Sequence, residues 1–215
     1  MDKREFRRKL TSLVLPITFQ QFMLAVVSAS DALMVGVIGQ DLLSAVSLAS
    51  QITFVYNLFL AAMTIGTSMF AAQYWGKGDK DGVERVLGIV LRSSMSVSFL
   101  FFIGATFLSE PLMRIFTSDP ELIRYGIQYL QIVGVTYLLC GISQIYLCIM
   151  KNSNLASMSM IISSSAAFLN IILNAVLIYG LFGAPRMETA GAAAATAIAR
   201  VVELLWVLWE LRKAG

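Results

Sequence analysis

Six apolar runs, each long enough to cross a lipid bilayer, constrain the fold of this chain more than any other feature. They cover residues 13–38, 44–74, 86–108, 122–150, 156–181 and 190–209. A membrane-spanning helix needs about 20 predominantly apolar residues. Because lipid admits only helices or closed barrels, and no run alternates as a barrel strand does, the runs predict an all-α membrane protein with a six-helix transmembrane bundle.

Composition leaves little room for anything else. Hydrophobic residues make up 58% of the 215 residues and charged residues only 13%, whereas an ordinary soluble domain carries about 25% charged residues. The chain therefore has no sizeable soluble domain, and its main partner is the lipid bilayer.

Basic residues outside the runs predict the orientation. Twelve Lys and Arg residues lie in the N-terminal segment, the tail and the connections on the same side, against three in the opposite connections. The positive-inside bias then places segments 1–12 and 213–215 in the cytoplasm, flanking a lobe over 13–212 in the cell membrane. A cleaved signal peptide is the alternative for the first run, but the run is too long and contains Gln20 and Gln21.

Several kinds of chemistry lack their usual residues. The sequence contains no histidine, which removes the commonest general base and nitrogen metal ligand. Cys140 and Cys148 lie eight residues apart in one run and cannot bridge each other. The glycine-rich stretch 76–82 completes neither a phosphate loop nor a calcium loop. We expect a protein that is not an enzyme, has no cofactor and binds no nucleic acid.

Asp31 is the polar residue that most needs an explanation, because it lies well inside the first run. A carboxylate at a helix centre costs about 2.5–3.5 kcal/mol on insertion scales, so it is a candidate functional group. With a rise of ~1.5 Å per residue, Asp31 lies ~27 Å from the cytoplasmic side, Asn170 ~20 Å and Asn174 ~26 Å, while Thr196 lies ~9 Å below the outer face. The four share the outer half of the membrane and together could hold a proton or a small hard cation. The alternatives are an Asp31 wetted from the outer loop and asparagines that merely join helices.

Other polar residues and breakers suggest a wet interior with a hinge. Gln51, Tyr129, Tyr137 and Gln144 are predicted to line a cavity, because a uniformly apolar bundle would not need them. Pro16, one turn into the first run, predicts a kink or interruption of its inner end, which either acts as a hinge or only sets the geometry with which the helix enters the membrane.

Three local patterns predict structural details. Arg200 and Glu203 are one turn apart and should pair. Small residues recur every four positions from Gly191, which allows close helix approach. Ser118 with Glu121 forms a capping box that begins the fourth span.

Four groups of residues, in order along the chain, resemble the multidrug and toxin extrusion (MATE) family. They are 15–17 (LPI) with 31–39 (DALMVGVIG), 71–79 (AAQYWGKGD), 170–174 (NIILN) with 177–180 (LIYG), and 191–196 (GAAAAT). The resemblance implies one lobe of a secondary transporter that exports drugs or small organic metabolites, including cationic ones, by antiport with H⁺ or Na⁺.

The resemblance also implies a cation- or proton-coupling site. It would use Asp31, Asn170, the position of Asn174, Ala192 and Thr196, with Na⁺ held by Asp31, Asn170 and Thr196 and with Pro16 as the kink. Family members with a described Na⁺ site have an aspartate where this chain has Asn174. A single carboxylate should weaken Na⁺ binding and favours a proton.

Family members have twelve spans in two lobes, whereas six are present here. We expect a homodimer, a second lobe, or a fragment of a longer protein. Two functional alternatives stay open: a lipid-linked saccharide flippase of the same superfamily, and a membrane scaffold that transports nothing.

Overall fold

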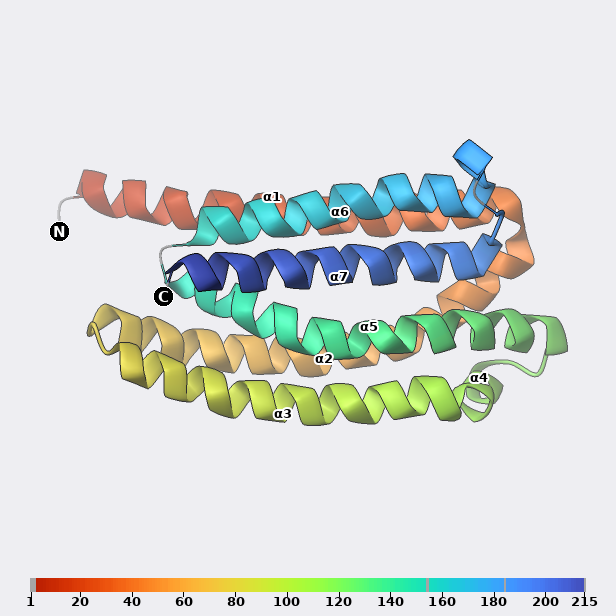
Figure 1. Ribbon diagram of the computed structural model, residues 1–215, viewed down its shortest axis with the longest axis horizontal. Helices are drawn as coiled ribbons and strands as arrows, with labels where there is room; N and C mark the ends of the chain where they lie inside the picture. Colours follow the sequence, from red (N-terminus) through yellow and green to blue (C-terminus); the bar gives the residue numbers. More distant parts are fainter. Residues whose placement is uncertain (1–2, 154, 184, 215) are drawn as a thin grey trace.

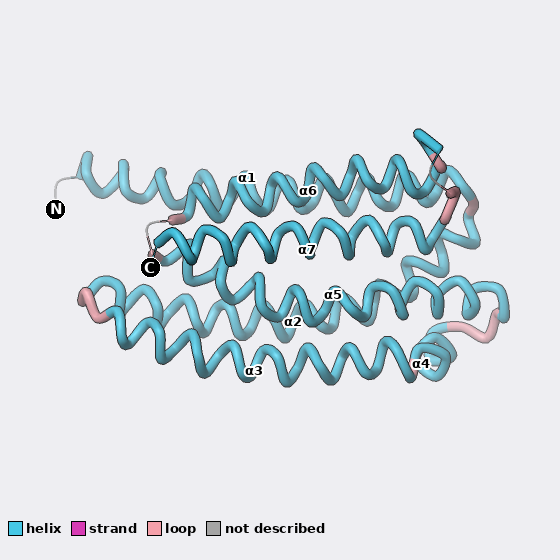
Figure 2. The backbone as a smooth tube through the Cα atoms, in the orientation of Figure 1, coloured by secondary structure: helices cyan, strands magenta, loops and turns pink. Residues whose placement is uncertain are grey.

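The computed structural model describes residues 3–153, 155–183 and 185–214. The outermost residues of the expected cytoplasmic segments, 1–2 and 215, lie outside this range. Seven α-helices and one short 3₁₀-helix make up the described chain. They are α1 (Lys3–Ile38), α2 (Gln40–Gly76), α3 (Lys80–Phe107), α4 (Ser109–Phe116), α5 (Pro120–Asn152), α6 (Ala156–Tyr179), η1 (Leu181–Gly183) and α7 (Glu188–Ala214). Figure 2 shows that short loops join them.

Six of these helices are long and apolar enough to span a membrane, which confirms the predicted six-helix bundle for the described residues. Their outer surfaces are apolar: Leu33, Val37 and Leu100 are each about 70% exposed or more. In a bilayer such side chains contact lipid instead of water. α1 begins and α7 ends at the same end of the bundle (Figure 1), as an even number of spans requires.

Polar and glycine residues fix where several helices begin and end. The Asp79 side chain accepts a hydrogen bond from the backbone N–H of Gly82 at 2.8 Å and caps α3. Gly180 ends α6 in the left-handed conformation, with φ 70°, where glycine carries no Cβ penalty.

The start of α5 corrects one local prediction. Its N-cap is Asp119, not Ser118, and the Asp119 side chain accepts from the Glu121 N–H at 2.9 Å. Pro120 occupies the first helical turn, where its missing N–H is harmless. The preceding connection also forms α4, a short helix that the sequence patterns did not predict, with an exposed Glu110–Arg114 pair at 2.7 Å.

α5 is the central helix of the bundle and packs against α2, α3 and α7, while α6 packs between α1 and α7. Figure 1 shows α1 and α6 side by side at one edge and α2 and α3 at the other. The main core lies between α2, α3 and α5 and includes Tyr56, Leu130 and Tyr137. α1 has little contact with α2 beyond the short connection around Gly39.

Glycines allow the closest helix approaches. A Cβ at Gly141 would lie 2.1 Å from the Ser98 hydroxyl oxygen, across the α3–α5 contact. A Cβ at Gly191 would lie 2.8 Å from the carbonyl oxygen of Leu177, which confirms that the small residues of α7 serve close packing on α6.

Candidate functional site

A cavity of about 660 Å³ lies among α1, α2, α5, α6 and α7. Its volume falls within the range of small-molecule sites, about 300–1,000 Å³. Four charged residues are in its lining: Asp31, Lys151, Arg200 and Glu203. The cavity therefore offers both signs of charge to a molecule inside it, in a bundle whose outer surface is apolar.

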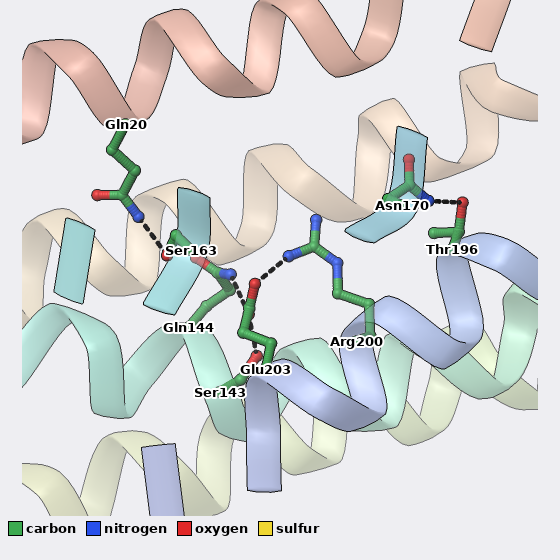
Figure 3. Close-up of polar contacts among 8 residues, drawn as sticks. All are labelled: Gln20, Ser143, Gln144, Ser163, Asn170, Thr196, Arg200 and Glu203. Carbon is green, nitrogen blue, oxygen red and sulfur yellow. Dashed lines mark hydrogen bonds and ion pairs between the residues drawn. The ribbon is translucent and has the colours of Figure 1, made fainter. Parts of the chain in front are cut away.

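A chain of hydrogen bonds joins α1, α6 and α7 at one part of the wall. The side-chain amide nitrogen of Asn174 donates to the Asp31 carboxylate and, at 3.3 Å, to the side-chain oxygen of Asn170. The amide nitrogen of Asn170 donates to the Thr196 hydroxyl at 3.3 Å (Figure 3). The Thr196 hydroxyl donates to the backbone carbonyl of Ala192 at 3.0 Å. The four residues that helix rise places in the outer half of the membrane thus lie next to one another: Asp31, Asn170, Asn174 and Thr196.

This chain of hydrogen bonds is rich in oxygen atoms and ends at one carboxylate, that of Asp31. Asn170 and Asn174 are buried, at 4% and 0% exposure, while Asp31, Asn170 and Thr196 line the cavity. The side-chain oxygen of Asn174 is buried with no hydrogen-bond donor among the described residues. An orphaned buried acceptor beside a carboxylate suits a proton or a small cation, because hard cations prefer oxygen ligands.

A second polar cluster joins α5 to α7 and confirms the predicted pairing of Arg200 with Glu203. The guanidinium Nη1 donates to Glu203 Oε2 at 2.8 Å. The other carboxylate oxygen, Oε1, accepts from the Ser143 hydroxyl at 2.9 Å and from the Gln144 amide at 3.1 Å (Figure 3). Glu203 is 1% exposed, so its charge is met entirely by these hydrogen bonds.

A third contact ties α1 to α6. The amide nitrogen of Gln20 donates to the Ser163 hydroxyl at 2.6 Å, and Gln20 is buried. Pro16 lies one turn before Gln20, and α1 is one continuous helix across it. The hinge role of Pro16 stays a prediction.

The four residues expected to line a cavity are in different places. Gln144 lines the cavity. Gln51 lies exposed on α2. Tyr137 and Tyr129 are outside the cavity lining and belong to the core of α2, α3 and α5. The Tyr137 hydroxyl instead hydrogen-bonds Thr53 at 2.8 Å, because the polar group of a buried tyrosine needs a partner.

Two site residues were missed in the sequence. Ser143 is one of many small polar residues and has no local signal. Lys151 directly follows the run 122–150 and counts among the basic residues of the expected cytoplasmic connections, yet it lines the cavity. A helical projection of α5 would have grouped it with Gln144, because residues seven apart share a face.

Comparisons with known proteins agree with this architecture. The sequence model of the MatE family matches residues 16–176. Multidrug resistance protein PmpM of Pseudomonas aeruginosa is 27% identical over 97% of this chain and 44% of its own length. The uncharacterized transporter YisQ of Bacillus subtilis is 26% identical over 95% and 45%, respectively. A probable multidrug resistance protein NorM of Thermotoga maritima is 26% identical over 92% and 43%.

Solved structures share the fold. A MOP-superfamily transporter from Pyrococcus furiosus superimposes with a TM-score of 0.85 at 23% identity, over 94% of this chain and 44% of that one. An outward-facing multidrug resistance MATE transporter also gives 0.85, at 23% identity and with the same coverage of both chains. The chain therefore spans a little less than half the length of the relatives that it matches.

Proposed function

Because the chain belongs to the MatE family, we propose that it is one lobe of a secondary transporter that exports drugs or small organic metabolites by antiport with H⁺ or Na⁺. The observation that carries this proposal is the hydrogen-bonded chain from Asp31 to Thr196 in the wall of a cavity of about 660 Å³. A carboxylate that binds the coupling ion beside the substrate space is what antiport requires. Among the relatives, PmpM is named as a multidrug resistance protein and YisQ as an uncharacterized transporter, and neither name is that of an enzyme.

Competition for the Asp31 carboxylate explains the exchange. A coupling ion that enters from outside neutralises this charge and binds across α1, α6 and α7, the three helices that the chain already joins. A cationic substrate loses its counter-charge at the same moment. Each ligand therefore favours departure of the other, as linkage between two binding events demands.

A proton is the favoured coupling ion. The hydrogen-bonded chain contains one carboxylate, and its other side-chain groups are neutral amides and a hydroxyl. Affinity for a hard cation rises with the number of charged ligands, so Na⁺ would bind weakly here.

A second lobe completes the transporter, and we propose that a second copy of this chain or a separate lobe supplies it. In the cell membrane, both termini would face the cytoplasm, in line with the excess of basic residues there. Cross-linking of the purified protein in detergent should give a species of two chains. A product of one chain only, at every cross-linker concentration, would contradict pairing of two copies.

Transport by Asp31→Asn tests the coupling site. The full chain is reconstituted in liposomes, and uptake of radiolabelled tetraethylammonium is measured under an imposed pH or Na⁺ gradient. Asparagine keeps the shape of the side chain but removes its charge, so uptake should fall at least about tenfold, which is 1.4 kcal/mol. Asp41→Asn is the matched control, because Asp41 lies exposed at the start of α2. Wild-type uptake by Asp31→Asn would exclude Asp31 as the coupling group, and no gradient-driven uptake by the wild type would favour a scaffold.

A further inference from the structure

We propose that Arg200, supported by Lys151, binds an anionic carboxylate or phosphate group of the transported molecule. This inference rests on the proposed transport function and names its substrate class: organic anions, including molecules that carry a positive group as well.

The guanidinium of Arg200 is only partly used by the protein. One of its N–H groups is bonded to Glu203, and its other N–H groups have no acceptor among the residues that the structure describes. A guanidinium has five N–H donors in a planar fork that matches a carboxylate or phosphate. The side chain is 27% exposed and lines the cavity. In Figure 3 it extends from α7 between the Gln20–Ser163 and Asn170–Thr196 contacts.

A purely structural role does not account for this arginine. Arg200 and Glu203 lie three residues apart on α7, so their ion pair joins no two helices. The α5–α7 connection is made by Ser143 and Gln144, which donate to Glu203 without help from Arg200. A basic residue in a membrane helix is costly to insert. Binding of an anion explains why a charge that is costly to insert lies in this helix.

Glu203 is the positioning residue for Arg200. Both of its oxygens are hydrogen-bonded, and it is 1% exposed. It therefore holds the guanidinium in place while its own charge is already satisfied by Arg200, Ser143 and Gln144. An anion in the cavity can therefore bond to the unused N–H groups of Arg200, while the charge of Glu203 is met by its own hydrogen bonds.

Lys151 adds positive charge to the same cavity. It lines the cavity from α5 and has no ion-pair partner among the described residues. It lies seven residues beyond Gln144, which is ~10 Å along the helix axis from the Glu203 contact. Lys151 therefore attracts an anion or contacts a second acidic group, while Arg200 makes the bidentate contact. Asp31 leaves a negative group elsewhere in the wall, where a cationic part of the same molecule fits.

Binding of radiolabelled p-aminohippurate, an organic anion, to the full chain in detergent tests the proposal without requiring transport. Arg200→Gln combined with Glu203→Gln removes both charges and should weaken binding at least about tenfold, because it removes the charge-assisted hydrogen bonds from the guanidinium to the anion. Lys151→Gln should weaken binding about two- to fivefold, the effect expected for one charge that solvent partly screens. The matched control is Glu110→Gln with Arg114→Gln, the exposed pair on α4, which should bind as the wild type does.

A second measurement separates a soluble anion from a lipid headgroup. Vesicles that contain the protein and a fluorescent phosphatidic acid report lipid movement between leaflets. Binding of p-aminohippurate that depends on Arg200 supports a soluble substrate, and Arg200-dependent movement of phosphatidic acid alone supports the same site with a lipid as its source. Arg200→Lys keeps the charge of the pair with Glu203 but lacks the planar fork, and it reports on the site if the double variant does not fold. The proposal is overturned if neither binding of p-aminohippurate nor movement of phosphatidic acid changes in the Arg200 variants.

The outcomes also distinguish this inference from the proposed function. Gradient-driven uptake of tetraethylammonium without any binding of p-aminohippurate would leave a transporter with no anion site. Binding of p-aminohippurate that is lost in the Arg200 variants supports the site even in a chain that transports nothing without a partner.

Discussion

Replacement of Gly191 by alanine would test how closely α6 and α7 must approach for the polar chain to form. An added Cβ would lie 2.8 Å from the carbonyl oxygen of Leu177 and 2.9 Å from its carbonyl carbon. These are backbone atoms that no rotamer change can move. Ordinary contacts of a Cβ begin at 3.4 Å, so the two helices must separate locally by about 0.6 Å, the difference between the two distances.

The separation of α6 from α7 at Gly191 should also move the helices apart at the candidate site. Thr196 lies five residues further along α7, and its hydroxyl accepts from Asn170 across the same α6–α7 contact at 3.3 Å. This distance is already at the long end for an N–H···O bond, so a small displacement breaks it. Overpacking costs about 1–3 kcal/mol and an interhelical hydrogen bond in a membrane about 0.6 kcal/mol. The expected loss of unfolding free energy, relative to a glycine-to-alanine change in a helix that meets no such contact, is therefore about 1.5–3.5 kcal/mol.

Unfolding of the protein in mixed micelles, titrated with sodium dodecyl sulfate, measures this loss. Gly88→Ala on α3 is the matched control, because a Cβ there has nothing within 4 Å and alanine favours helix by up to about 1 kcal/mol. Gly191→Ala should unfold at lower detergent fraction than the wild type, and Gly88→Ala should not. If Gly191→Ala is as stable as Gly88→Ala, the close approach of α6 to α7 has no energetic role and the reasoning fails.

Three further substitutions test other contacts. Glu203→Ala leaves Arg200 without its partner and should lower the free energy of unfolding by about 3 kcal/mol, the lower end for a broken buried pair because Arg200 faces the cavity. Unfolding at the same detergent fraction as the wild type would show that the pair does not stabilise the protein. Asp119→Ala removes the N-cap of α5 and should lower the free energy of unfolding by about 0.5–2 kcal/mol in the same assay. A change no larger than that of Asp41→Asn would show that the cap does not stabilise the protein. Tyr56→Phe removes hydrogen bonds of the tyrosine hydroxyl at 2.7 and 2.9 Å and should lower the unfolding midpoint by an amount equal to about 1–2 kcal/mol; a stabilised variant would mean that the hydroxyl is strained there.

The candidate site was partly predictable because depth in a membrane follows from counting residues. Asp31, Asn170 and Thr196 fall in one half of the bilayer by helix rise alone, and the structure brings them together. The same counting does not say which way a side chain points around its helix. Gln51 was chosen for the same reason as Gln144, yet it lies exposed on α2 while Gln144 lines the cavity.

The sequence by itself determined the helical class, the six spans and the Arg200–Glu203 pair, because bilayer thickness fixes the length of a span and a pair three residues apart is local to one helix. Tertiary structure alone decided that Ser143 and Gln144 bond Glu203, that Lys151 lines the cavity, and that Asn174 bonds both Asp31 and Asn170. These contacts depend on the rotation and partner of each helix. Rotation and partner are set by where glycine and serine let backbones approach, as Gly191 does against Leu177.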